Sequence, residues 1–495
     1  MGVNVVRDAL RTQLSEVIAT RMGLHFPPER WPDLERGLAG AAKEFGLADA
    51  AACVDWLLSA ALTKPQLEVL AGHLTVGETY FFREKKMFDA LAGTFLPELM
   101  RTRRGSERRL RIWSAACCTG EEPYSLSILL QQVIPDLAEW QVTILATDIN
   151  PQFLKKAAAG VYGEWSFREA AAAFKESYFR RTPEGRYAIL PEIKKRVTFA
   201  HLNLMDDVYP SLATDTNAMD LILCRNVMIY FALPTAEKVV GNLRRSLREE
   251  GWLVVSPSEC SQYLFSRFAP VNFPGVILYR KTTGKEPVTP AWTPPPVSEM
   301  TEPFVPYFEP TPVVAVTSLA EPAAAEESVT PQTVAAAFYE EGHYAEAAET
   351  LLAAFNSSAA PDSEMASLLA RALANQGKLA EALAWCERWL AADKMDAAGH
   401  YLRAMILQEL GDRDEGRRSL QRAIYLNADF VLAHFALGNL ARDGDKAEEA
   451  DKHFANALYL LRQCEPDDPL PESDGLTAAR LTEIIHSISA LEATP

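Results

Sequence analysis

The chain of 495 residues lacks several features that mark common classes of protein. It has no run of roughly 18 or more apolar residues, so no transmembrane helix is expected. Its first residues, Met-Gly-Val-Asn-Val-Val-Arg-Asp, lack an apolar signal core and predict the start of a helix. The seven cysteines show no metal-ligand spacing, so we expect no metal site, and reduced thiols in a cytoplasmic protein.

Positive charge is scarce in the second part of the chain. The net charge is −17, yet residues 1–284 carry 34 lysines and arginines against 32 aspartates and glutamates, whereas residues 285–495 carry 15 against 34. The second part would repel nucleic acid and acidic membranes. The first part is free to present a basic face to an anionic partner, although a solvated helix surface explains any single residue nearly as well. The candidate basic residues are Arg7, Arg11, Arg21, Arg30, Arg36 and Lys43.

Residues 1–73 predict a small all-α domain, and residues 74–284 predict an α/β domain in which short strands alternate with helices around a parallel sheet. A strand, a turn at Pro183-Glu184-Gly185 and a second strand predict a small antiparallel β insertion at about residues 178–190. Helices are expected at 5–22, 29–45, 47–62, 65–74, 120–132, after Pro151 and at 236–249. Strands are expected at 109–114, 141–146, 197–200, 220–224, 251–256 and 275–279. Six arginines between Arg101 and Arg111 are interpreted as a charged connector.

The last third of the chain is repetitive. Residues 285–330 hold ten prolines and predict a solvated linker. In residues 331–464, Gly342, Gly377, Gly411 and Asp445 recur at spacings of 35, 34 and 34. A period of 34 with small residues at helix contacts is typical of tetratricopeptide repeats, so four repeats in an all-α solenoid are expected. Residues 465–495 should add a capping helix, over 477–491, and a tail.

One polar turn follows the first predicted strand. The sequence Trp113-Ser-Ala-Ala-Cys-Cys-Thr-Gly-Glu-Glu-Pro-Tyr-Ser125 lets a ligand approach the backbone and a helix N-terminus, but it lacks the three glycines of a dinucleotide fingerprint. Glu121 and Glu122 would repel a phosphate and suit a cation. Alternatively, they are helix-start carboxylates that complement the helix dipole.

Polar residues also end the later strands. Asp148 closes the second strand, where an acid commonly accepts hydrogen bonds from ribose hydroxyls; the alternative is a helix N-cap, for which Asn150 is better placed. Arg225 and Asn226 open the run Cys224-Arg-Asn-Val-Met-Ile-Tyr-Phe231 directly after apolar residues, which is unusual for a core. Tyr230 in that run is either a functional residue or a side chain that simply packs. Asn203-Leu204 follows the third strand and could equally be an ordinary loop.

A further run, Thr75-Val-Gly-Glu-Thr-Tyr-Phe-Phe-Arg-Glu84, precedes the sheet. Phe81 and Phe82 are expected to anchor this segment over the core. Arg83 is the residue of interest, because an arginine in a cleft can hold a carboxylate bidentately.

In this order the three runs resemble those of the CheR-type chemoreceptor methyltransferases, which transfer a methyl group from S-adenosylmethionine to receptor glutamates and release S-adenosylhomocysteine. The resemblance implies a Rossmann-like methyltransferase domain with an antiparallel β insertion. The short loop of the insertion resembles members that do not hold a receptor tether peptide. By this resemblance the cofactor-contacting residues are Thr79, Arg83, Glu121, Asp148, Asn203, Leu204, Arg225 and Asn226. Arg83 and Tyr230 would lie near the transferred methyl group, and Gly77 stands where the best-known members have a cofactor-contacting Asn.

The resemblance implies a protein-glutamate O-methyltransferase that needs no metal and no dedicated general base. A glutamate carboxylate has a pKa of about 4.3 and is already ionised near neutral pH, so Arg83 and Tyr230 need only orient it. Methyl-accepting chemoreceptors, with acidic coiled coils, are the expected partners, in chemotaxis or an alternative chemosensory pathway. The repeats would dock an unknown protein. The alternatives are a cofactor-binding scaffold whose repeats carry the function and a methyltransferase for small molecules or nucleic acid.

Overall fold

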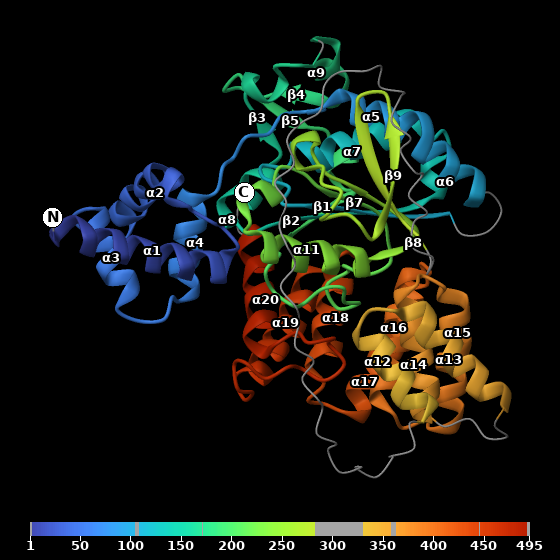
Figure 1. Ribbon diagram of the computed structural model, residues 1–495. Helices are drawn as coiled ribbons and strands as arrows, with labels where there is room; N and C mark the ends of the chain where they lie inside the picture. The colour runs from blue at the N-terminus through green and yellow to red at the C-terminus, as the bar shows by residue number, and fades with distance from the viewer. Residues whose placement is uncertain are drawn as a thin grey trace, which may run out of the picture.

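The computed structural model describes residues 2–103, 108–170, 172–282, 330–357, 363–444 and 446–492. The predicted linker, apart from Thr330, lies outside the described residues, as do Asp445 and the end of the tail. Three regions are visible in Figure 1: a group of helices at the N-terminus, a central α/β region, and a C-terminal array of helices. Among the described residues, no helix is long and apolar enough to cross a membrane.

The N-terminal region consists of four helices around one apolar core. These are α1 (Gly2–Met22), α2 (Trp31–Glu44), α3 (Ala50–Leu58) and α4 (Lys64–Leu74). Leu14, Leu38 and Leu70 are buried between them. The third helix is shorter than the predicted 47–62, because the Asp49 side chain caps its start by accepting a hydrogen bond from the Ala52 N–H at 2.9 Å.

The central region is built on a seven-stranded sheet in the order β6-β2-β1-β7-β8-β10-β9. Neighbouring strands are parallel from β6 to β8, and β10 and β9 run antiparallel to complete one edge. The strands are β1 (Arg109–Ala115), β2 (Gln141–Asp148), β6 (Val197–His201), β7 (Met219–Cys224), β8 (Leu247–Val254), β9 (Phe268–Phe273) and β10 (Val276–Lys281). All residues of the central strands β1 and β7 are buried, which confirms the predicted parallel α/β sheet.

Helices cover both faces of this sheet (Figure 1). The helices are α5 (Lys85–Ala90), α6 (Leu96–Arg103), α7 (Glu121–Val133), α8 (Pro151–Ala159) and α11 (Leu233–Ser246). The prediction at 236–249 ran too far, because β8 begins directly at Leu247. The β insertion is also larger than predicted: β4 (Phe179–Arg181) and β5 (Tyr187–Ile189) are joined by β3 (Val161–Tyr162) in a three-stranded sheet.

The C-terminal helices pack as consecutive pairs, and each pair contacts the next. They are α12 (Pro331–Glu340), α13 (Tyr344–Ser357), α14 (Ser363–Asn375), α15 (Leu379–Ala392), α16 (Ala397–Glu409), α17 (Arg413–Leu426), α18 (Val431–Arg442) and α19 (Ala447–Leu461). Gly342, Gly377 and Gly411 each turn the chain inside a pair with a positive φ, of 76°, 76° and 88°. This backbone requirement explains the recurring glycine. The helix α20 (Ala478–Glu492) follows α19.

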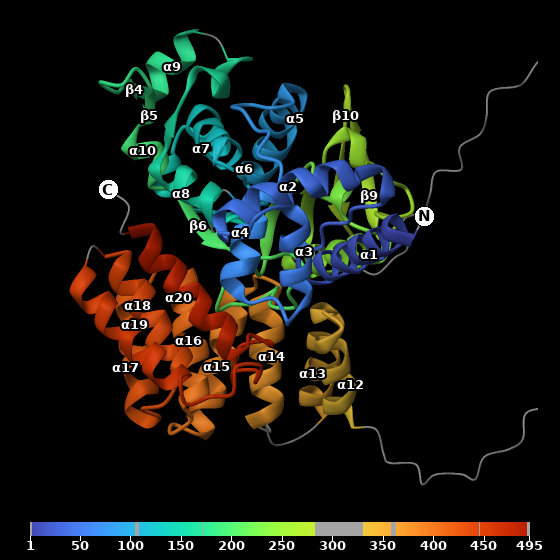
Figure 2. The ribbon, with the colours of Figure 1, turned by 90° about the vertical axis from the view of Figure 1, so that its left-hand side faces the viewer.

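The helical array folds back against the central sheet (Figure 2). One hydrophobic cluster joins Trp113 and Tyr209 of the α/β region to Phe435 of α18 and Leu481 of α20. At the amino end of β1, Arg109 and Arg111 both form buried ion pairs with Glu409 of α16. Interpreting this arginine-rich segment as only a charged connector was therefore wrong, because two of its arginines fasten the repeats to the sheet.

Candidate functional site

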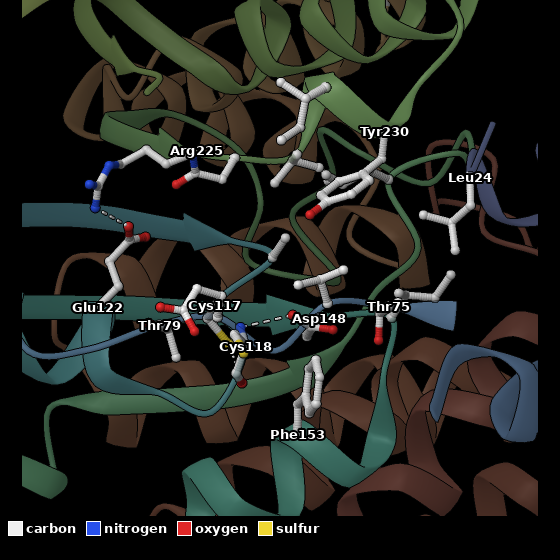
Figure 3. Close-up of a pocket in the computed structure, with 18 of the residues that line it drawn as sticks. Leu24, Thr75, Thr79, Cys117, Cys118, Glu122, Asp148, Phe153, Arg225 and Tyr230 are labelled. Carbon is white, nitrogen blue, oxygen red and sulfur yellow. Dashed lines mark hydrogen bonds and ion pairs between the residues drawn. The ribbon is translucent and has the colours of Figure 1, made fainter. Parts of the chain in front are cut away.

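A cavity of about 330 Å³ lies at the carboxyl ends of β1, β2 and β7, where ligands of open α/β sheets bind. Figure 3 shows its walls, with Asp148 and the turn after β1 below, and Tyr230 and Arg225 above. The end of α1, the run before α5 and the segment after β6 complete the lining. Of the predicted site residues, the cavity brings together Thr79, Arg83, Asp148, Asn203, Leu204, Arg225, Asn226 and Tyr230.

The turn after β1 has an unusual backbone. Ala116, Cys118 and Gly120 all have positive φ, at 60°, 52° and 93°. Two constraints require glycine at position 120. Its φ is positive, and an added Cβ would lie 2.8 Å from the Cβ of Ala157. The tight turn directs the Cys118 N–H to the Asp148 carboxylate at 2.8 Å. Burial raises the pKa of the Cys118 thiol, so this thiol lines the cavity in its neutral form.

Asp148 is the buried carboxylate of the cavity. Its exposed fraction is 5%, and its two oxygens accept hydrogen bonds from the Cys118 and Asn150 N–H groups, each at 2.8 Å. Burial outweighs these bonds and raises its pKa to about 6. Asn150, as predicted, caps α8 by accepting from the Gln152 N–H at 2.9 Å. Asp148 therefore does not cap α8, and both of its oxygens accept backbone hydrogen bonds instead.

The two glutamates at the start of α7 point in different directions. Glu121 is 2% exposed, does not line the cavity, and accepts hydrogen bonds from Thr119 at 2.7 Å and Ser166 at 2.9 Å. Burial raises its pKa, and the same two hydrogen bonds oppose that shift. Glu122 does line the cavity, where it accepts from Ser114 at 2.7 Å. Glu121 was the predicted cofactor contact, whereas Glu122 is the glutamate that lies in the cavity wall.

Arg225 forms ion pairs with two glutamates. It pairs with Glu122 at 2.8 Å and with Glu84 at 3.1 Å, and donates a hydrogen bond to the Arg83 carbonyl at 2.8 Å. The next residue, Asn226, has a positive φ of 59°, and Glu259 accepts hydrogen bonds from its N–H and from those of Val227 and Met228. Glu259 was not among the predicted site residues. Its only signal was an acid three residues after Ser256, a capping-box spacing that the structure realises.

Arg83 and Tyr230 both line the cavity, and both side chains are half-buried. The Arg83 guanidinium donates a hydrogen bond to the Glu78 carbonyl at 2.6 Å and stays partly exposed. The Tyr230 hydroxyl points into the cavity (Figure 3). Burial raises the pKa of Tyr230, against the opposing effect of Arg30 and Arg83. Arg30 of the N-terminal region lies over the Tyr230 ring at 5.2 Å.

Helix α1 and the run before α5 each make one further contact at the site. Asn203 donates a hydrogen bond to the Arg21 carbonyl at 2.8 Å, which ties the segment after β6 to α1. Gly77 lies so close to Phe153 that an added Cβ would be 2.8 Å from its ring. Phe153 lines the cavity at this point, so a larger side chain at position 77 would collide with the wall.

The basic residues proposed to dock a partner are only partly available. Arg11 pairs with Glu35, and both Arg30 and Arg36 pair with Asp33. Arg21 and Lys43 are exposed, and the Arg7 side chain lies outside the described part of the structure. The acids on α2 reduce the positive potential of this face.

The cavity suits a ligand with an apolar body, hydroxyl groups and positive charge. Leu24, Phe153 and Val227 supply apolar walls, whereas Glu122 and Asp148 supply carboxylates. A buried carboxylate that already accepts two backbone N–H groups retains lone pairs for hydroxyl donors. Among the described residues no cluster of His, Cys, Asp and Glu could hold a metal ion.

Comparison with known proteins agrees with this geometry. A family model described as "CheR methyltransferase, SAM binding domain" matches residues 77–273. The chain is 31% identical over 261 residues to the "Chemotaxis protein methyltransferase" of Borreliella burgdorferi, which covers 52% of this chain and 90% of that protein. It is 29% identical over 405 residues to the "Probable biofilm formation methyltransferase WspC" of Pseudomonas aeruginosa, covering 77% of this chain and 83% of that protein. Among solved structures, MamA aligns with a TM-score of 0.26 at 18% identity, over 27% of this chain and 77% of that chain.

Proposed function

Since this chain belongs to the CheR methyltransferase family, whose matching domain binds S-adenosylmethionine, we propose that it methylates glutamate side chains of bacterial chemoreceptors. The products are a glutamyl methyl ester and S-adenosylhomocysteine. The pathway is chemotaxis or an alternative chemosensory pathway, and the repeats dock a partner protein. The relatives' names, which include a chemotaxis and a biofilm-formation methyltransferase, support this proposal.

The observation that carries the proposal is the pairing of two kinds of group in one cavity. Asp148 lies at its base, where a buried carboxylate suits the ribose hydroxyls of an adenosine cofactor. Arg83 and Tyr230 also line the cavity and are half-buried, so a guanidinium and a hydroxyl stay accessible to an incoming carboxylate. The cofactor would therefore be held inside, and the protein substrate would approach from outside.

The cofactor would be held by residues of the cavity wall, with Glu122 rather than Glu121 as the glutamate among them. The others are Thr79, Arg83, Asp148, Asn203, Leu204, Arg225 and Asn226. When bound, S-adenosylmethionine supplies an electrophilic methyl group on a sulfonium centre. Glu122 and Glu84 already neutralise Arg225, so this buried arginine would not repel the sulfonium.

The substrate glutamate needs orientation more than activation. Its carboxylate is ionised near neutral pH and needs no general base. Arg83 would hold one carboxylate oxygen, and the Tyr230 hydroxyl would donate to it and direct the other oxygen toward the methyl group. Partial exposure of Arg83 keeps this interaction weak enough to leave the oxygen nucleophilic.

The test is transfer of radiolabelled methyl groups from S-adenosylmethionine to receptor-enriched membranes of the source organism. We expect base-labile label on a receptor band with the wild-type chain, and on the order of 100-fold less with Arg83→Ala, because the orienting cation is lost. The matched control is Arg418→Ala, which removes an exposed arginine of α17 and should leave transfer unchanged. Binding of S-adenosylhomocysteine, measured by calorimetry, should be unchanged in Arg418→Ala and should fall far less than transfer in Arg83→Ala, because the other cofactor contacts remain. Tight binding without any label on receptors would contradict the enzyme proposal and favour the scaffold.

A further inference from the structure

The helix that ends the repeat region reaches the α/β region at the edge of the cofactor cavity. In Figure 2, α20 runs beside α8 and β6, and it contacts both elements. Its Arg480 side chain is 8% exposed and points into this contact. Arg480 at the carboxyl end of β6 therefore adds a second charged contact to the ion pairs that Glu409 makes at the amino ends of the strands.

Arg480 makes contacts on both sides of the junction. Its Nη2 donates to the His201 carbonyl at 3.1 Å, and its Nη1 lies 3.2 Å from the His201 Nδ1. The guanidinium also pairs with Glu483 at 2.7 Å, and its Nε lies 3.4 Å from Asp206. One side chain thus holds the last residue of β6 by its backbone and by its ring.

The proton on His201 can be assigned from these contacts. A guanidinium only donates hydrogen bonds, so Nδ1 must accept and Nε2 must carry the proton. Nε2 then donates to the Ile149 carbonyl at 2.9 Å. Burial lowers the pKa of His201 to about 3, helped by Arg480 and Lys64, so the ring is neutral and the arrangement persists at physiological pH.

The hydrogen bonds from Arg480 through His201 reach two segments, one at Ile149 and one directly after His201. Both segments line the cofactor cavity. Ile149 directly follows Asp148, and His201 directly precedes the segment of Leu202, Asn203 and Leu204. The two segments are also joined to each other, because the Leu202 N–H donates to the Asp148 carbonyl at 3.1 Å. A contact made by the repeat region therefore ends one residue away from the carboxylate at the base of the cavity.

We propose that Arg480 is a positioning residue for S-adenosylmethionine, acting through His201 on the segments that carry Asp148 and Asn203. The docked repeat region is then a structural part of the cofactor site. This inference rests on the proposed function only in taking the cofactor to be bound in this cavity. Coupling is reciprocal, so the bound cofactor also strengthens the docking of α20.

The test measures the affinity for S-adenosylhomocysteine by calorimetry, using the full chain. Arg480→Ala should weaken binding by about tenfold, within the range usual for coupled sites, because both segments lose their tie. Arg480→Lys should recover part of the loss, since an ammonium can still donate to the His201 carbonyl. Arg462→Ala, which removes an exposed arginine at the end of α19, is the matched control and should bind like the wild type.

A double-mutant cycle separates positioning from general destabilisation. If Arg480 acts through His201, then His201→Ala should weaken binding alone, and the double variant should lose less than the sum of the two. In the methylation assay the KM for S-adenosylmethionine should rise while kcat at saturation is kept. Should Arg480→Ala fail to fold by circular dichroism, Arg480→Lys and His201→Ala carry the same comparison.

Two outcomes are decisive. Affinities of Arg480→Ala and His201→Ala within twofold of the wild type would overturn the positioning role alone. Failure of the wild-type chain to bind S-adenosylhomocysteine would overturn both this inference and the proposed function.

Discussion

The buried arginines at the amino ends of the parallel strands and the buried Asp148 at their carboxyl ends are compensated in different ways. At the amino ends, Arg109 and Arg111 share Glu409, and Arg103 pairs with Asp220, so that each cation meets an acid within the protein. At the carboxyl ends, Asp148 is just as buried, but within the described part of the chain it meets backbone N–H groups and no cation. The buried arginines have their acidic partners within the protein, whereas the Asp148 carboxylate can still accept hydrogen bonds from a ligand.

This difference separates an interface from a site. Charges that are buried and fully paired fix one arrangement of two regions and leave nothing for a third molecule. A carboxylate whose pKa is raised by burial is poised to gain from hydroxyl donors that a cofactor brings. Burial alone would not have distinguished the two ends, whereas the identity of the partners does.

The largest effect is expected at the paired end. Glu409→Ala leaves two buried guanidiniums without their shared carboxylate, which should lower the free energy of unfolding by about 3–5 kcal/mol. Urea denaturation followed by tryptophan fluorescence measures the change. Glu449→Ala is the control, since its ion pair with Arg417 lies nearer the surface of the repeats and should contribute about 1 kcal/mol or less. Equal losses in the two variants would remove the distinction between the two ends.

The next effect is expected at the open end. Asp148→Asn keeps the size of the side chain but removes its charge and turns an acceptor into a donor beside two N–H groups. Affinity for S-adenosylhomocysteine should fall on the order of 100-fold, or about 2.7 kcal/mol. Calorimetry on the variant gives the value, and Asp136→Asn, at the other end of the sheet, should bind normally. Normal binding by Asp148→Asn would show that this carboxylate does not contact the cofactor.

A smaller effect is expected from pH. The Asp148 pKa is raised from 3.8 to about 6, so the folded chain holds this proton where the unfolded chain has lost it. The contribution of Asp148 to stability is therefore greatest below about pH 4 and is lost as pH rises through about 6. The affinity for the cofactor should depend on pH in the opposite direction, because binding needs the ionised form of Asp148. This affinity should fall about tenfold from pH 7 to pH 5. Calorimetry across this range should give a flat profile for Asp148→Asn, and a flat wild-type profile would contradict the assignment.

The smallest effect is expected at Tyr230 in the cavity wall. Tyr230→Phe removes one hydroxyl donor and should lower kcat for methyl transfer by about fivefold without changing cofactor affinity. Tyr80 also lines the cavity, but its hydroxyl donates to Glu169 at 2.9 Å, so Tyr80→Phe should have a weaker effect. Steady-state kinetics with receptor membranes compare the two. A wild-type rate for Tyr230→Phe would leave substrate orientation to Arg83.

The parts of the fold that a local sequence pattern marks were predicted correctly. Strands β1, β2, β6 and β7 were found because apolar runs end there in polar residues, and the helical pairs were found from their period. The strand β9 was missed because its sequence, Phe-Ala-Pro-Val-Asn-Phe, contains a proline that is tolerated at the sheet edge. Helices α5 and α6 were missed because they are short, with 6 and 8 residues, and the π-helical turn Leu91–Phe95 between them interrupts the regular helical period.

The predicted site was limited in a different way. Residue positions at strand ends correctly indicated which segments meet, but not which of two adjacent glutamates faces the cavity, because that depends on Ser166 and Thr119 capturing Glu121. The link between Arg111 and Glu409 joins residues nearly 300 positions apart, and no local pattern encodes it. Only the packed chain reveals such pairs.

The buried attachment of the repeats has a consequence for how this protein can be taken apart. Removing the C-terminal helices would expose Arg109, Arg111 and the apolar surface around Tyr209 that α18 and α20 now cover. A catalytic fragment would therefore be a different molecule, less soluble and less able to hold its cofactor. Exchanging these repeats for those of another protein would require replacing the matching surface of the sheet as well.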